Sequence, residues 1–460
     1  MSRRKGLHCA AALAAVSALV GAIVGPPGAW AITPPPINPA AVPPDTVGPE
    51  QPMRPSTICQ TPGVLEASNF TDPPPAWRLL DLEAARPLAT GAGVTVALID
   101  TGVTPNPRLA NLRPGGDYIV ESDQGLHDCD GHGTLVAGII AAAPSRTDGF
   151  VGVAPDAALI SIRQSSEYFD LQNPAPANAD PNASRTAIDL RAMARAVVHA
   201  ANLGAQVVNI SMVSCMKAVH PVDDATLGAA IHWAVAERNV VVVAAAGNTG
   251  NECNPQNPPP AANDPGSWSN VVTVASPAWW ADDVLSVASV TNDGVPSTFS
   301  LHGPWVGVAA PGETITSVGN YPDGHLVNGL PGKDGPLVPI YGTSFAAAYV
   351  SGVAALVRQK YPELNAYQVI NRIKSTAHAG PAPTDPAVGW GVVDPLAALT
   401  WNVADPAPKL PVNKVIVPAP APPAPDVAPR RVASWVLGGV AAAAVIIVAA
   451  VAALRRKPHS

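Results

Sequence analysis

Short apolar runs alternate along the middle of the chain with segments whose apolar residues recur at helical spacing. The runs have the length and composition of parallel strands buried on both faces, and they occupy residues 93–99, 158–163, 206–211 and 240–245. Helical spacing predicts helices over residues 134–143, 184–203, 224–238 and 344–361. Further strands are predicted at residues 271–274, 284–290 and 306–309. Strands separated by helices predict an α/β fold with a central parallel sheet covered by helices on both faces, and reactive groups at the carboxyl ends of its strands.

Two longer apolar stretches lie near the ends of the chain. Basic residues 2–5 (SRRK) precede an apolar stretch and a small-x-small cleavage pattern (AWA), so we expect a secretory signal peptide over residues 1–31. The Arg pair within it leaves twin-arginine export as an alternative route. Residues 432–454 carry no charge and are long enough to span a membrane. Because a signal peptide directs the export of the body behind it, we expect the body outside the cell membrane and a cytoplasmic tail at residues 455–460.

Proline-rich segments flank the predicted body. The chain holds 53 prolines in 460 residues, gathered at both ends and in a few loops. Residues 32–75 are a cleavable pro-segment, a disordered leader or an extended arm, and we favour an arm held to the body by a disulfide, because the stretch is too Pro-rich for a compact domain. A Pro/Ala linker is predicted at residues 401–431. Long loops interrupt the body at residues 164–181, 254–270 and 320–339.

Charge and cysteine content narrow the function classes. The formal net charge is -7, with no long basic run, which argues against nucleic-acid binding. After removal of the signal peptide an even set of cysteines remains, namely Cys59, Cys129, Cys215 and Cys253. An even number in an exported chain predicts two disulfides, and three pairings are open from the sequence.

Three motifs supply an acid, a base and a nucleophile, in that order. Asp100 ends the strand run VALIDTG (96–102), His132 stands in DGHGT (130–134), and Ser344 stands in GTSFA (342–346). A serine hydroxyl needs a neutral imidazole to accept its proton, and the imidazole needs an acid on its other nitrogen. Ser344 also opens an apolar helix, where backbone N–H groups and the helix dipole favour developing negative charge.

An oxyanion donor is the remaining requirement of this chemistry. Residues 240–248 (VVVVAAAGN) form a buried strand that ends in the amide Asn248. A side-chain donor of this kind contributes on the order of 10² to 10³ in turnover. We therefore assign Asn248 to the oxyanion hole, together with the backbone N–H of Ser344.

These four segments resemble the subtilases, the subtilisin superfamily of serine peptidases, and the resemblance covers about residues 76–399. It implies a subtilisin-like three-layer fold with Asp100, His132 and Ser344 as the catalytic triad. It also implies substrate contacts at Ser211, Met212, Ala246 and Gly247. The order of signal peptide, arm, body, spacer and span is similar to that of the mycosins, the membrane-anchored subtilases of type VII secretion systems.

The resemblance to the mycosins carries further expectations. It implies pairing of Cys59 with Cys129 and of Cys215 with Cys253. It implies a peptidase that needs no calcium, works with the secretion membrane complex and acts on a secreted polypeptide. It also implies a role in holding that complex together, which gives the alternative interpretation of a structural subunit whose proteolysis is secondary. The predicted segments are a signal peptide (1–31), an arm (32–75), a peptidase domain (76–400), a linker (401–431), a transmembrane helix (432–454) and a tail (455–460).

Several residues depart from the subtilase pattern. Met212 comes after Ser211 where most subtilases have a glycine-containing substrate strand, so we expect a narrowed first specificity pocket. Phe345 stands where subtilisins usually have methionine, and Ala348 where many have proline. Residues 127–132 (HDCDGH) carry metal-ligand side chains, but we interpret them as a solvated loop because His132 and Cys129 already have roles. No metal or cofactor is required for the proposed chemistry, although calcium ligands often leave no motif.

Overall fold

A computed structural model of the protein describes residues 32–173, 180–250, 253–260, 264, 266–332, 335–380 and 384–404. These residues belong to the first of two units into which the chain divides, Met1–Lys409. The predicted signal peptide, most of the linker, the predicted membrane span and the tail lie outside them. Among the residues that are described, no helix has both the length and the apolar character that a membrane crossing requires.

The central sheet contains seven strands in the described part of the chain, and every neighbouring pair is parallel. Their order across the sheet is β11 (Val306–Pro311), β10 (Val284–Val290), β8 (Val241–Ala245), β6 (Val207–Ile210), β2 (Thr95–Asp100), β4 (Ala158–Arg163) and β3 (Leu112–Asp117). The early strands lie on one side of β2 and the later strands on the other, so the strand order reverses beside β2. Ligand sites in α/β sheets occur at such reversals, beyond the carboxyl ends of the strands.

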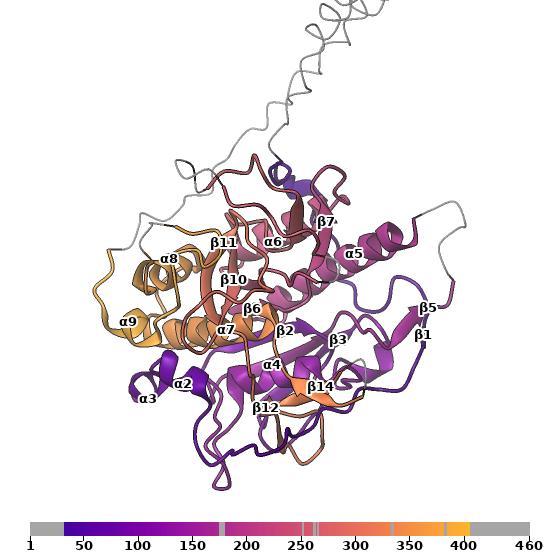
Figure 1. Cartoon of the computed structure of the whole chain (residues 1–460). Coiled ribbons are helices and arrows are strands. Elements are labelled where there is room, and N and C mark those ends of the chain that lie inside the picture. The colour runs from indigo at the N-terminus through magenta and orange to yellow at the C-terminus, as the bar shows by residue number, and fades with distance from the viewer. Residues whose placement is uncertain are drawn as a thin grey trace, which may run out of the picture. The chain divides into compact units, whose positions relative to one another are not determined.

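Helices cover both faces of the sheet (Figure 1). α4 (His132–Ala141) packs against α7 (Thr343–Lys360), and α5 (Pro181–Asn202) packs against α6 (Ala225–Ala236). α8 (Ala366–Thr376) and α9 (Pro395–Thr400) contact each other and α7. The predicted α/β architecture is therefore confirmed.

Helix α7, which carries Ser344, is buried along nearly its whole length. Its many Ala, Gly and Ser residues allow close approach of the neighbouring segments. At Gly352 an added Cβ atom would lie 2.5 Å from the Cβ atom of Val153, closer than van der Waals contact permits. Small side chains thus fix the position of α7 against the body.

The remaining elements are short. Two-stranded antiparallel ribbons join β1 (Met53–Pro55) to β5 (Phe169–Leu171), β7 (Ser214–Lys217) to β9 (Thr273–Ser276), β12 (Ser317–Val318) to β13 (Leu326–Val327), and β14 (Gly329–Pro331) to β15 (Leu337–Pro339). Short helices occur at η1 (Pro39–Ala41), α2 (Pro75–Leu79), α3 (Leu82–Ala85) and η2 (Glu121–Asp123). The strand predicted at residues 271–274 is β9, which begins later and lies in a ribbon, not in the central sheet.

The Pro-rich residues 32–73, which we term the N-terminal segment, contact the surface of the body at several points. Asp45 Oδ1 lies 2.7 Å from His199 Nδ1 on α5, and Arg191 Nε of the same helix donates to Glu50 at 3.0 Å. β1 of this segment pairs with β5. These contacts alternate with extended stretches, as expected where proline removes backbone donors.

Two disulfides are present in the described residues. Cys59 of the N-terminal segment is bonded to Cys129, which lies 70 positions later in the sequence, and their Cα atoms are 4.6 Å apart. Cys215 is bonded to Cys253, with a Cα separation of 4.9 Å. Both pairs are those that the resemblance implied. The first ties the N-terminal segment to the loop that precedes His132.

Candidate active site

Three elements bring the predicted acid, base and nucleophile to the carboxyl edge of the sheet. Asp100 is the last residue of β2, His132 is the first residue of α4, and Ser344 lies in the first turn of α7. α4 and α7 pack against each other over this part of the sheet. The fold thereby collects residues that are far apart in the sequence.

The imidazole of His132 lies between the other two side chains. Its Nδ1 atom is 2.7 Å from Asp100 Oδ1, and its Nε2 atom is 2.8 Å from Ser344 Oγ. In the neutral tautomer that carries its proton on Nδ1, this nitrogen donates to the carboxylate and Nε2 is free to accept the serine proton. The side chain of Asp100 is 1% exposed and that of His132 is 24% exposed, so solvent reaches the imidazole but not the carboxylate.

The buried carboxylate and the imidazole shift each other's pKa. Burial alone would raise the pKa of Asp100, but the charge and hydrogen bond of His132, with smaller contributions from Ser211 and Thr101, together outweigh it, so the pKa is lowered. Burial alone would lower the pKa of His132, but Asp100 outweighs it, so the pKa is raised. Asp128 and Asp130 add smaller contributions in the same direction. The site favours a negative carboxylate beside a basic imidazole.

A second buried carboxylate, Asp128, organises the backbone around Asp100 and His132. It accepts hydrogen bonds from Gly131 N, from Thr134 N and Oγ1, and from Thr101 Oγ1, at 2.6 to 2.8 Å. Burial raises its pKa to about 6, with Asp100 adding to the rise. Sequence reasoning placed Asp128 in a solvated loop, and that interpretation is wrong for this residue, which is 3% exposed. Three of its four donors belong to Gly131 and Thr134, close by in the sequence, and the fourth belongs to Thr101 after β2.

Two glycines permit the close contact between the acid loop and the base helix. At Gly133 an added Cβ atom would lie 2.0 Å from the carbonyl oxygen of Gly102 and 3.1 Å from Asp100 Oδ1. Any side chain at this position would push α4 away from β2. Gly133 is thus required for the position of His132.

The side chain of Asn248 is held by the start of α7. Its Oδ1 atom accepts hydrogen bonds from Thr343 N at 2.9 Å and Thr343 Oγ1 at 3.0 Å, which leaves the Nδ2 donor for another partner. A Cβ atom built on Gly342 would lie 3.1 Å from Ser344 Oγ and 3.6 Å from Asn248 Nδ2. The hydroxyl and the amide therefore border the same small space, where an oxyanion would form beside the nucleophile.

The residues expected to contact substrate follow two adjacent strands of the sheet, β6 and β8. Ser211 directly follows β6, and Met212 after it is partly buried against the core. Ala246 and Gly247 follow β8 and are buried. An added Cβ atom at Gly247 would lie 3.2 Å from Cys253 Sγ, so the second disulfide lies directly behind this strand end.

The loop before His132 offers no thiolate to a metal. Cys129 is disulfide-bonded, and Asp130 accepts hydrogen bonds from Ser166 Oγ at 2.5 Å and from Glu167 N at 2.8 Å. Across the described residues, no set of three or more His, Cys, Asp or Glu side chains is arranged to hold a metal ion. Asp130 instead connects this loop to the loop after β4.

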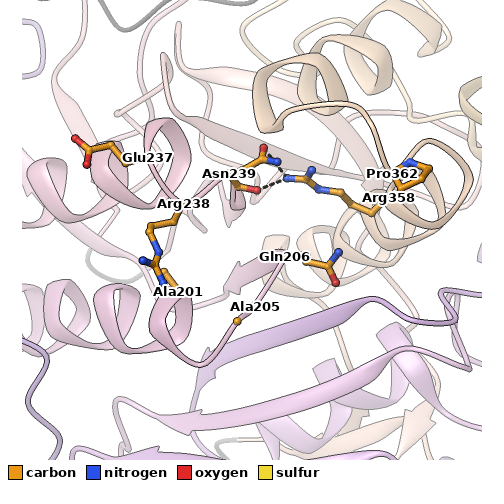
Figure 2. A pocket seen from close by; sticks show the side chains of 9 residues that line it. Ala201, Ala205, Gln206, Glu237, Arg238, Asn239, Arg358 and Pro362 are labelled. Atoms are coloured by element: carbon orange, nitrogen blue, oxygen red, sulfur yellow. Dashed lines mark hydrogen bonds between the residues drawn. The ribbon is translucent and has the colours of Figure 1, made fainter.

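A cavity of about 420 Å³ lies at the opposite edge of the sheet. Gln206 and Asn239, which line it, precede β6 and β8, so the cavity lies at the amino ends of these strands. Figure 2 shows Arg358, another lining residue, with its guanidinium directed at Asn239, whose carbonyl oxygen accepts from it. The residues that line this cavity do not include Asp100, His132 or Ser344.

Comparison with known proteins gives consistent matches. The sequence model of the subtilase family matches residues 91–391 of this chain. Mycosin-1 of Mycolicibacterium smegmatis is 50% identical over 448 residues, which cover 96% of this chain and 98% of that protein.

Solved structures show the same similarity. The crystal structure of MycP1 from Mycobacterium smegmatis has a TM-score of 0.78 and 52% identity, and the match covers 82% of this chain and 97% of that one. A chain in the structure of an intact ESX-5 inner membrane complex has a TM-score of 0.78 and 44% identity, over 93% of this chain and all of that one.

Proposed function

Because this chain belongs to the subtilase family and is a serine endopeptidase, we propose that Asp100, His132 and Ser344 carry out its peptide-bond cleavage. The observation that carries the proposal is the pair of hydrogen bonds made by His132, one to the acid and one to the nucleophile. A histidine held in this way can take a proton from serine and return it to a leaving amine.

The geometry supports an acyl-enzyme mechanism. Ser344 Oγ attacks the substrate carbonyl carbon while His132 Nε2 takes its proton, and Asp100 stabilises the imidazolium that forms. The negative oxygen of the tetrahedral intermediate accepts hydrogen bonds from Asn248 Nδ2 and the Ser344 backbone N–H. His132 then protonates the leaving amine as the C–N bond breaks. Water, deprotonated by His132, hydrolyses the acyl ester and regenerates Ser344.

We further propose that substrate lies along Ser211, Met212, Ala246 and Gly247. Ser211 and Gly247 follow the adjacent strands β6 and β8, so the segments after them are suited to line opposite sides of the substrate residue that precedes the cleaved bond. Met212 reduces the space available there. Small side chains are therefore expected at that substrate position.

The N-terminal segment is proposed to remain attached as an arm. Its disulfide to Cys129 and its contacts with α5 support this role. A backbone cut after Cys59 would leave the segment covalently bound as long as this disulfide is oxidised. Reducing and non-reducing gels of the exported protein test the attachment.

The proposed location is the cell membrane, with the peptidase domain outside. The sequence supports this location through its signal peptide (1–31), linker (401–431), apolar span (432–454) and basic tail. Protease accessibility of the body in spheroplasts, compared with that of a C-terminal tag, tests the topology.

The proposed partner is the membrane complex of a type VII secretion system, and the proposed substrate is a polypeptide exported by it. Similarity to mycosin-1 and to a chain of the ESX-5 inner membrane complex supports both assignments. The test compares the N-termini of secreted proteins between cells that carry the wild type and cells that carry Ser344→Ala. New N-termini that depend on Ser344 support a processing peptidase, whereas identical N-termini would contradict it.

A structural role in the complex is the second candidate, favoured by the similarity to a chain within an assembled complex. Complementation of a deletion strain with Ser344→Ala separates the two functions, because the variant keeps the fold and loses the nucleophile. Restored secretion at normal protein abundance would show that scaffolding is sufficient. Ser286→Ala, which removes a buried hydroxyl in β10 that makes no hydrogen bond, is the matched control.

A further inference from the structure

One oxygen of the Asp100 carboxylate accepts hydrogen bonds and the other does not. Oδ1 accepts from His132 Nδ1 at 2.7 Å and from Thr101 N at 2.8 Å. Oδ2 is buried and has no hydrogen bond that meets ordinary geometric limits. A buried, charged oxygen without a donor is costly, so a nearby donor is expected to serve it.

The Ser211 hydroxyl is the candidate donor. In the pairing of β2 with β6, Leu98 lies opposite Asn209 and Ile99 lies opposite Ile210, so Asp100 and Ser211 come next, side by side, at the edge of the sheet. Alternation along a strand places Asn209 and Ser211 on the same face. The Ser211 side chain is also one of the groups that lower the pKa of Asp100.

A buried chain of hydrogen bonds fixes the direction of this hydroxyl. Ser351 Oγ on α7 donates to Asn209 Oδ1 at 2.8 Å, and Asn209 Nδ2 donates to Ser211 Oγ at 2.8 Å. Because Ser211 Oγ accepts from the amide, its own proton is left for another acceptor. Every donor in the chain then points toward the negative charge on Asp100, an arrangement in which each bond strengthens the next.

This series of hydrogen bonds begins at Ser351 on α7, the helix that also carries Ser344. Ser351 stands seven residues after Ser344, about two helical turns, and therefore on the same face of α7. Asn209 and Ser351 are both 0% exposed. α7 thus holds the proposed triad at two points, directly through Ser344 and indirectly through Ser351.

We propose that Ser351 and Asn209 are positioning residues for the proposed peptidase reaction, which hold the Ser211 hydroxyl so that it donates to Asp100 Oδ2. The proposal rests on the proposed function of the triad. It assigns no contact with substrate to Ser351 or Asn209. Their effect passes through the alignment and charge of Asp100.

Loss of these hydrogen bonds is expected to change the pKa of His132 in one definite direction. Without the Ser211 donor, more negative charge on Asp100 faces His132, so the imidazolium is better stabilised and the pKa of His132 rises further. The other charged groups near the pair are Asp128 and Asp130, from the loop before α4, and Arg163 at the end of β4. None of these is changed by substitution at Ser211 or Ser351.

The test uses the full-length protein and two measurements. One is the rate at which a fluorophosphonate labels Ser344 as a function of pH, and the other is the NMR titration of the His132 imidazole, assigned by its absence in His132→Gln. Ser211→Ala is expected to slow labelling about tenfold, as for loss of a hydrogen bond to a charged group. In this variant the pH at which labelling begins to rise and the midpoint of the His132 titration both move to higher pH.

Ser351→Ala is expected to move both curves in the same direction by a smaller amount. In Ser211→Ala/Ser351→Ala the second change has no further effect, because its path has already been removed. Ser286→Ala leaves both curves in place. Ser351→Cys, which keeps the side-chain size and weakens the donor, is the alternative if Ser351→Ala does not fold.

Three results would overturn the inference. They are unchanged curves in folded Ser351→Ala, a loss of stability without movement of either curve, and a double variant whose effects multiply. Failure of the wild type to react with the probe would instead contradict the proposed function. The His132 titration does not depend on that reaction, so it still decides the inference.

Discussion

Asp100 and Arg163 are directly paired in the register of β2 and β4, yet the arginine does not bind the carboxylate of Asp100. The guanidinium of Arg163 lies 3.6 Å from Asp117 and 3.2 Å from Asp123, and its carbon is 4.7 Å from the centre of the Phe169 ring. These partners draw the cation away from the triad. The charge of Asp100 therefore remains available to His132.

The first prediction concerns pH. Because the pKa of His132 is raised and catalysis needs the neutral imidazole, the labelling rate of Ser344 is expected to rise with pH, with a midpoint above the ordinary histidine value of 6.5. Asp130→Asn removes one of the negative charges that raise this pKa and keeps a side chain of the same shape, so the midpoint moves to lower pH. A midpoint below 6.5 in the wild type, or an upward shift in Asp130→Asn, would contradict the assigned electrostatics.

The second prediction concerns the oxyanion donor. Asn248→Ala and Asn248→Asp both remove Nδ2, and each is expected to lower kcat by about 10² to 10³ with little change in KM. Asn248→Asp retains an acceptor for the two Thr343 donors, so it separates loss of the donor from loss of the loop structure. Steady-state kinetics on a peptide substrate provide the measurement. Near-normal kcat in Asn248→Asp would exclude the side chain from the oxyanion hole.

The third prediction concerns the disulfide that holds the N-terminal segment. Cys59→Ser/Cys129→Ser opens a loop closed across 70 residues, and the chain-entropy estimate for such a loop is about 4 kcal/mol of stability. Arg191→Gln, which removes an exposed ion pair of the same segment, is expected to cost less than about 1 kcal/mol. Denaturant unfolding of both variants measures the difference. Equal stability losses would show that the disulfide is no more important than a surface contact.

The fourth prediction concerns oxidation beside the base. Phe345 is 2% exposed, and its ring centre lies 5.1 Å from that of His132. The wild type is expected to keep its labelling rate in mild peroxide, whereas Phe345→Met forms a polar sulfoxide at this position and loses it. Met212→Leu controls for the partly buried methionine in the substrate segment. Rapid inactivation of the wild type that Met212→Leu prevents would contradict the prediction.

The buried parallel strands could be predicted because burial on both faces requires apolar side chains at successive positions. The apolar runs within β2 and β8 face apolar contacts on both sides, so these sequences carry no polar alternation. β3 could not be predicted from its side chains in this way. Its sequence, LRPGGD, is typical of a turn, and it is a strand only because β4 offers it a partner at the edge of the sheet.

α8 was missed although its start carries a local signal. Asn365 and Gln368 form a capping box, with side chains that bind each other's backbone N–H groups. The helix comes closely after α7. Its apolar residues lie mainly on one face, and Arg372 and Lys374 interrupt them in the sequence. The capping residues would have located it.

The triad motifs gave the identity of the three side chains but not the groups that support them. The contact of Ser351 with Asn209 depends on packing between segments far apart in the chain, and Asp128 meets Thr101 only when β2 lies beside its loop. Asp128 looks like one of several acidic loop residues until its four donors are brought together. Ser351 looks like a small residue of an apolar helix until Asn209 faces it.

The central claim is that His132 activates Ser344. Full-length protein treated with a fluorophosphonate, digested and analysed by mass spectrometry, is expected to carry the adduct on Ser344 in the wild type and Ser286→Ala, and to lose it in Ser344→Ala and His132→Ala. A folded wild type that carries no adduct on Ser344, or equally rapid labelling in His132→Ala, would contradict it.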